Sequence, residues 1–97
     1  MRIYLAVNAE LLEQLADGRR ISAPAFRAGS EDEEDELAAL EEASEHGFVV
    51  AVAEVDGSDD VALENIVSFH VDLDGSGDLA WFATQEIDAV LREAQKR

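Results

Sequence analysis

Residues Val61–Arg97 read VALENIVSFHVDLDGSGDLAWFATQEIDAVLREAQKR, and the interpretation of this stretch decides the fold. Apolar and polar residues alternate over Ile66–Asp72, which predicts a strand. The Gly-rich segment that follows predicts a tight turn, and Leu79–Ala83 predicts a second strand that is rich in aromatic residues. Gln85–Gln95 then carries apolar residues at helical spacing, with Thr84 as a capping residue before it. The stretch therefore predicts a β-hairpin followed by a closing helix.

Residues 79–83 also fit a longer helix that Asp78 would cap, because several apolar side chains from Leu79 to Leu91 would share one helical face. We favour the strand, since Thr84 suits a cap better than a helix interior and aromatic residues favour strands. On a strand, Trp81 and Phe82 point to opposite faces. One of the two is therefore expected to be partly exposed, which hints at a contact surface.

The turn between the two strands matches the front of an EF-hand calcium loop. Asp72, Asp74 and Ser76 stand at the first, third and fifth positions, and Gly77 stands where such a loop turns sharply. The twelfth position holds Ala83 instead of a bidentate Glu, and the segment before the loop alternates like a strand. A hairpin turn is the favoured interpretation. A metal site at Asp72, Asp74, Ser76 and Asp78 remains the alternative, because carboxylates close together attract a counter-ion.

The remaining elements complete an α+β fold of a single domain over residues 1–97. Phe48–Val55 and Arg2–Val7 are apolar on both faces, which predicts interior strands. The other expected elements are a helix Ala9–Asp17, a short edge strand Ala25–Ala28, a helix that Ser30 starts and Gly47 ends, and a loop Asp56–Asp60. The order β-α-β-α-β-β-β-α predicts a two-layer sandwich with helices on one face of a mixed or mostly antiparallel sheet. The residues expected in the core are Leu40, Val49, Val52, Phe69 and Leu91.

Charge is the most unusual property of the composition. The chain has 97 residues and carries seven Lys and Arg against 23 Asp and Glu, for a net charge of −16. No basic residue lies between Arg27 and Arg92. Such a surface repels nucleic acid and anionic membranes and attracts basic proteins or cations. An acidic surface that serves solubility alone is the other explanation.

Six consecutive acids open the second helix: Glu31, Asp32, Glu33, Glu34, Asp35 and Glu36. Ser30 and Glu33 have the spacing of a capping box, and the helix dipole favours acids in the first turn. This run is either a docking surface for a basic partner, together with Trp81, or a solvated helix start.

Few kinds of chemistry fit the remaining residues. The chain has no Cys, so it has no thiol nucleophile and no thiolate metal site. It shows no phosphate loop, no nucleophile elbow and no zinc-binding helix motif. His46 and His70 lie on different elements and are expected to be structural. We therefore expect a non-enzymatic protein without a cofactor. With no long apolar run for a signal peptide or a membrane span, a cytoplasmic location is expected.

Several short motifs resemble an uncharacterised family of small acidic proteins from actinobacteria or their phages. They are MRIYLAV at the start, AF at Phe26, DEEDELAAL in the acidic helix, FHVD in the strand Ile66–Asp72 and LAWFATQEI near the end. Members of that family begin and close with similar segments. The resemblance implies a high-GC source but no activity and no binding residues. The connection LDGSG is shorter here than in the family, which favours the hairpin.

Three functions are compatible with these observations. The leading hypothesis is an acidic protein-interaction domain, in its sharper form a nucleic-acid mimic that occupies the basic groove of a DNA-binding protein. The second is a divalent-cation binder that uses the turn Asp72–Asp78. The third, and least favoured, is a small enzyme that uses scattered carboxylates, since nothing singles out an acid and a base among them.

Overall fold

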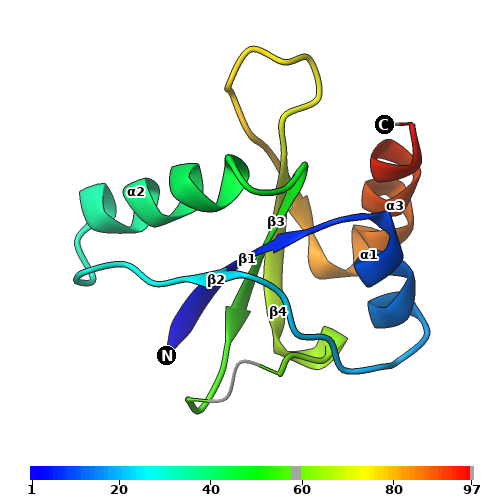
Figure 1. Cartoon of the computed structure of the whole chain (residues 1–97), viewed down its shortest axis with the longest axis horizontal. Coiled ribbons are helices and arrows are strands. Elements are labelled where there is room, and N and C mark those ends of the chain that lie inside the picture. Colours follow the sequence, from blue (N-terminus) through cyan, green and yellow to red (C-terminus); the bar gives the residue numbers. More distant parts are fainter. Residues whose placement is uncertain (58–59, 97) are drawn as a thin grey trace.

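The computed structural model describes residues 1–57 and 60–96, and within them it shows three α-helices and one five-stranded antiparallel sheet (Figure 1). The elements are β1 (Arg2–Val7), α1 (Ala9–Ala16), β2 (Ala25–Phe26), α2 (Glu33–Ser44), β3 (Val49–Glu54), β4 (Ile66–Val71), β5 (Ala80–Ala83) and α3 (Ile87–Gln95). Short 3₁₀ turns at Leu63–Asn65 and Thr84–Glu86 precede β4 and α3. The expected α+β class and element order are confirmed. Residues 58–59 of the expected loop Asp56–Asp60 lie outside the described residues.

The strand order in the sheet is β2-β1-β3-β4-β5. The apolar strand β3 is central, as its sequence predicts, and β2 and β5 form the two edges. β4 and β5 pair as an antiparallel hairpin, with His70 opposite Trp81 and Phe69 opposite Phe82. The hairpin interpretation of the final stretch is therefore confirmed. The loop between these strands projects beyond the rest of the chain at the top of Figure 1.

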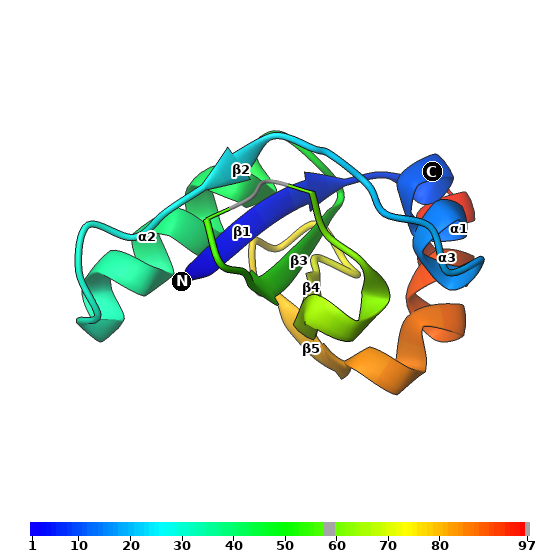
Figure 2. The same cartoon turned by 90° about the horizontal axis from the view of Figure 1, so that it is seen from below.

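Helices cover both faces of the sheet, which corrects the expectation that all helices share one face. In Figures 1 and 2, α2 lies on one side of the strands and α1 and α3 lie together on the other. The cause is visible in β1 and β3, each of which is buried at five consecutive positions. Alternate residues of a strand point to opposite faces, so such a strand needs cover on both.

The main core lies between the sheet and the helices α1 and α3. Phe69 is fully buried at its centre, opposite Ala51 of β3 and Phe82 of β5. Leu12 and Leu15 of α1 and Val90 of α3 are fully buried against this face. Leu91, which was expected to be buried, is only partly buried, because Ile87, Val90 and Ala94 form the face of α3 that is buried in the core.

Small side chains bring α2 close to the other face. Ala39 and Ala43 are its buried residues, packed against Tyr4, Val50 and Val52 of the sheet. Leu40 was among the residues that the sequence predicted to be buried. Leu40 is only partly buried and Leu37 is exposed, because the helix turns its alanines toward the strands.

Two predicted helix starts also differ from the structure. Helix α2 begins at Glu33, after Asp32, and the Ser30 hydroxyl bonds to the Asp35 carboxylate instead of forming a capping box with Glu33. Helix α3 begins at Ile87, and Thr84 donates its hydroxyl hydrogen to the carbonyl oxygen of Ile66 at 2.7 Å. Both hydroxyls stabilise the segment before the helix and do not cap the first turn of the helix.

Candidate functional site

A groove of about 400 Å³ lies between α2 and the half of the sheet that α2 leaves open. Helix α2 packs against β1, β2 and β3, so the same face of β4 and β5 has no helix over it among the described residues. One wall of the groove comes from α2 and its floor comes from the strands. The lining residues are Arg2, Tyr4, Glu33, Glu36, Leu37, Leu40, Val52, Val67, Ser68, His70 and Trp81.

Three exposed apolar side chains dominate this groove. Trp81 is 62% exposed, Leu37 is 53% exposed and Val67 is 42% exposed. The tryptophan on the open sheet face and the leucine on the adjoining helix therefore expose apolar surface to the same groove. Such surfaces mark contact sites in soluble proteins more often than isolated apolar residues do.

A bulge in β4 places Val67 in the groove. The register between β3 and β4 shifts so that Ala53 pairs with Ile66 and Val52 pairs with Ser68, which leaves Val67 as an extra residue. Ile66 is consequently buried on the main core side, whereas strict alternation would place it with Ser68 and His70. Bulges of this kind redirect a side chain at the border of a site.

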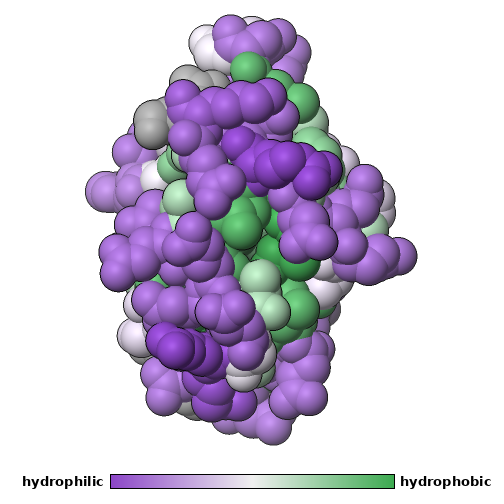
Figure 3. All heavy atoms as spheres, turned by 90° about the vertical axis from the view of Figure 1, so that its right-hand side faces the viewer, coloured by the Kyte–Doolittle hydropathy of each residue, from purple (hydrophilic) through white to green (hydrophobic). Residues whose placement is uncertain are grey.

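The far side of the molecule has a different character. Figure 3 shows the side of α1 and α3, where hydrophilic residues surround an apolar area at the centre of the view. The large apolar side chains that are exposed in the described part of the chain are Met1, Leu37, Val67, Leu73 and Trp81, and none of them belongs to α1 or α3. Three of these five side chains, Leu37, Val67 and Trp81, line the groove.

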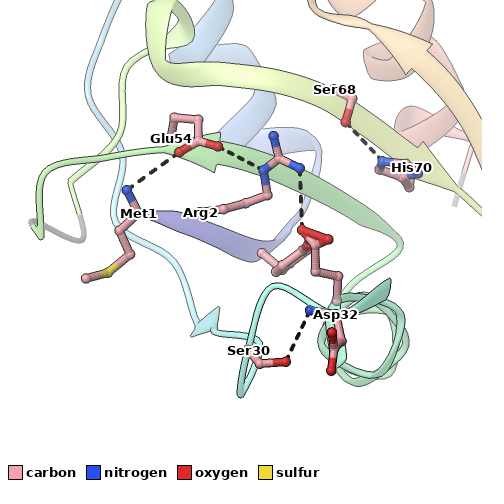
Figure 4. Close-up of polar contacts among 9 residues, drawn as sticks. Met1, Arg2, Ser30, Asp32, Glu54, Ser68 and His70 are labelled. Carbon is pink, nitrogen blue, oxygen red and sulfur yellow. Dashed lines mark hydrogen bonds and ion pairs between the residues drawn. The ribbon is translucent and has the colours of Figure 1, made fainter. Parts of the chain in front are cut away.

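A charged cluster closes one end of the groove. The Arg2 guanidinium bonds to the Glu54 carboxylate at 2.9 Å and lies 3.5 Å from the Glu36 carboxylate (Figure 4). The Tyr4 hydroxyl donates to Glu36 at 3.4 Å. Burial, and after it the Glu36 carboxylate, raises the pKa of Tyr4, so this hydroxyl keeps its proton near neutral pH. Arg2 thus fixes Glu36, while Glu33 one turn earlier stays exposed.

His70 and Ser68 form the polar part of the floor. The Ser68 hydroxyl and the His70 Nε2 lie 3.0 Å apart, and the dashed line between Ser68 and His70 in Figure 4 marks this contact. Burial lowers the pKa of His70, because the charged imidazolium is less well hydrated in a partly buried position than in water. In the neutral tautomer with Nε2 unprotonated, the imidazole can accept a hydrogen bond from the Ser68 hydroxyl. No acid in hydrogen-bond contact with His70 completes a catalytic triad in the described part of the chain.

His70 is expected to make stability depend on pH. Its pKa in the fold lies below that of the unfolded chain, about 6.5, so the unfolded chain binds more protons. The contribution of neutral His70 to the free energy of unfolding is fully present above about pH 6.5. It is lost as the pH falls from there through the pKa of His70 in the folded state. Urea unfolding should therefore show that His70→Gln loses less stability than the wild type does when the pH is lowered through this window. His46→Gln serves as the control for the second histidine, and an unchanged pH dependence in His70→Gln would contradict the prediction.

The groove brings together some of the residues that the sequence singled out. Glu33 and Glu36 line it together with Trp81, which lies far from both acids in the chain. Glu31 lines a neighbouring hollow with Arg2, Tyr4 and Glu54. The other acids of the run, Asp32, Glu34 and Asp35, do not line the groove. The acidic run is therefore divided by the helix into a groove side and an outer side.

Leu37, Val67 and His70 belong to the groove but were not among the residues that the sequence indicated. His70 could have been found from its place two residues from Ser68 on one strand, since residues i and i+2 share a face. Nothing in the local sequence indicates the bulge at Val67, because the strand around it contains no glycine. The exposure of Leu37 follows from the rotation of α2, which is a tertiary effect.

The turn after β4 uses its carboxylates to hold its own backbone. The Asp72 carboxylate accepts hydrogen bonds from the backbone N–H groups of Gly75 and Gly77, at 2.8 and 3.0 Å. Asp74 accepts one from the N–H of Ser76 at 3.0 Å, and hydrogen bonds from Ser76 lower the pKa of Asp74. Both glycines have positive φ, 77° and 91°, which favours glycine. In the part of the chain that the structure describes, no group of three or more acidic, His or Cys side chains converges on a metal position.

Calcium is therefore expected to have little effect on this turn. Titration with millimolar Ca²⁺ should shift the melting temperature no more than Mg²⁺ at the same concentration does, because both ions only screen a net charge of −16. Melting curves of the wild type and of Asp74→Ala test this. A saturable stabilisation by Ca²⁺ at micromolar concentrations that Asp74→Ala removes would establish the metal site instead.

Within residues 1–57 and 60–96 no helix combines the length and the apolar character that a membrane span requires. A comparison of the chain with protein-family models, with curated proteins and with solved structures finds no match. The resemblance to small acidic actinobacterial proteins stays a prediction, and the function has to be argued from the groove.

Proposed function

We propose that the chain is a protein-interaction domain that binds a basic partner protein through the groove between α2 and β4–β5. The observation that carries this proposal is the exposed surface of Trp81, Leu37 and Val67 next to Glu33 in the acidic first turn of α2. Apolar side chains supply most of the affinity of a protein interface, and tryptophan is among the residues that contribute most. Acids at the border select the partner.

The charge of the whole chain supports a basic partner. A net charge of −16 on 97 residues creates a field that attracts cationic surfaces and accelerates their encounter with the groove. The same field disfavours self-association and contact with other acidic proteins. Arg2 does not cancel it at the groove, because its guanidinium is bound to Glu54 and lies next to Glu36.

Mimicry of nucleic acid is the sharper form of this proposal. A basic protein that uses its DNA-binding surface to hold the groove would release the domain when duplex DNA is added. If the partner binds DNA and the domain at the same time, the two do not share a surface. This outcome would support a basic partner but would contradict mimicry.

Two charge reversals in the same helical turn test the role of the groove. Glu33 lines the groove and Glu34 does not, yet both are exposed and adjacent. Glu33→Lys and Glu34→Lys therefore change the net charge equally. Because a reversal turns an attractive contact into a repulsive one, we expect Glu33→Lys to weaken binding of a basic helical probe by about tenfold and Glu34→Lys by about twofold or less.

The probe is a synthetic peptide of about 18 residues with leucines on one helical face and lysines elsewhere, about 27 Å long when helical. It contains no tryptophan, so the fluorescence of Trp81, the only tryptophan of the chain, reports contact at the groove. Affinity should fall as NaCl is raised, while the melting temperature of the free domain should rise, since salt screens its internal repulsion. Equal affinities for the two reversals, or no Trp81 response to the peptide at low salt, would overturn the proposal.

A further inference from the structure

The two faces of the sheet are covered unequally. Among the described residues, one face carries α1 and α3 side by side, and α2 is the helix on the other face (Figures 1 and 2). Building on the proposed function, we infer that the basic partner supplies an amphipathic helix, which lies beside α2 on β4 and β5 and fills the second helix position of that face.

The dimensions of the open surface match one helix. Neighbouring strands lie about 4.8 Å apart, so β4 and β5 together offer a strip about 10 Å wide. An α-helix with its side chains is about 10–12 Å across, and packed helices lie about 8–10 Å apart. β4 has six residues and is about 20 Å long, and α2 borders the groove with its first two turns, through Glu33, Glu36, Leu37 and Leu40. A partner helix of three to four turns would cover the floor and contact the first two turns of α2.

The side chains of the groove define the sequence of this partner helix. Trp81 and Val67 rise from the floor, and Leu37 projects from α2 toward the same space, so the helix needs large apolar residues at positions i, i+3, i+4 and i+7. Glu33 and Glu36 stand on the wall formed by the first turn of α2. Lys or Arg on the flank of the partner helix that faces this wall would pair with Glu33, which is exposed, while Glu36 stays next to Arg2. The occupant is thus a basic amphipathic helix.

Addition of a partner strand to the edge of β5 is less favoured by the structure. β5 has only four residues, and the backbone N–H of Ala83 is already bonded to the Glu86 carboxylate at 2.9 Å. This contact occupies a donor that an added strand would need. A second copy of the chain is disfavoured too, because each copy carries a net charge of −16.

Two peptides of matched charge test the helical form of the partner. The first is the Leu/Lys peptide described above, and the second has proline in place of one central leucine, which prevents a continuous helix. Both are titrated into the full chain, and the fluorescence of Trp81 and the heat of binding are measured. We expect the helical peptide to bind at least about tenfold more tightly than the proline peptide.

Two leucine variants add the positional control. Leu37 lines the groove, whereas Leu73, which is 44% exposed, lies in the turn and outside the groove. We expect Leu37→Gln to weaken binding of the helical peptide about fivefold or more and Leu73→Gln to leave it within about twofold. Equal affinity of the two peptides, with Trp81 responding to both, would overturn the helix and leave the basic-partner function standing. The absence of a Trp81 response to either peptide would overturn both. Equal effects of the two leucine variants would overturn the position of the helix.

Discussion

Replacement of Phe69 by alanine is expected to lower the free energy of unfolding by about 3–5 kcal/mol. Phe69 is fully buried at the centre of β4, between Ala51 of β3 and Phe82 of β5. Its removal loses the transfer free energy of an aromatic side chain and leaves a cavity that the sheet cannot close. A domain of this size has a total stability of about 5–15 kcal/mol, so the loss is a large fraction of it.

Val67→Ala is the matched control for this experiment, because Val67 lies on the same strand but is 42% exposed. We expect it to cost less than about 1 kcal/mol. Urea unfolding of both variants, followed by circular dichroism, measures the two values. Similar losses for Phe69→Ala and Val67→Ala would show that the register of β4 and its bulge are wrong.

Replacement of Trp81 by alanine is expected to change the stability of the domain little and to weaken peptide binding strongly, in contrast to Phe69→Ala. Trp81 lies on the edge strand β5 and is 62% exposed, so the folded domain should lose about 1 kcal/mol or less. At the centre of an interface, a tryptophan contributes about 2 kcal/mol or more. The affinity for the basic helical peptide should therefore fall about 30-fold or more.

Trp81→Phe is the control variant, since phenylalanine keeps an aromatic ring and strand propensity at this position. We expect it to retain most of the affinity. Isothermal titration calorimetry is the suitable measurement, because both variants lack the fluorescent side chain. If Trp81→Ala binds the peptide as tightly as the wild type does, the groove is not the contact surface.

The sequence predicted the strands of this fold better than the positions of its helices. Phe48–Val55 and Ile66–Asp72 were recognised because apolar runs and alternation are local signals. The continuous apolar run of β1 and β3 already required cover on both faces, and this consequence would have placed a helix on each side. The rotation of α2 was not predictable in the same way. Ala39 and Ala43 face the strands because small side chains allow a close approach, which depends on Tyr4 and Val50 opposite them.

The candidate site could be predicted only in part for similar reasons. The alternation of Trp81 and Phe82 indicated that one aromatic side chain would be exposed, and the structure identifies it as Trp81. Glu33 and Glu36 were indicated by the acidic run. Glu33 and Glu36 line the groove and Glu34 does not, and this difference arises only from the packing of α2 against the sheet. The place of Val67 depends on a bulge between β3 and β4, which is a property of two strands and not of one segment.

Mapping of the basic helical peptide on the isotopically labelled domain by NMR tests the groove most directly. Backbone amide signals are compared before and after the peptide is added, at low salt, and every residue reports its own environment. We expect the largest changes on the groove side of α2, at Glu33 and Leu37, and on the open strands, at Val67, His70 and Trp81. Changes centred instead on α1 and α3, or on the turn Asp72–Asp78, with α2, β4 and β5 unaffected, would contradict a docking groove on this face.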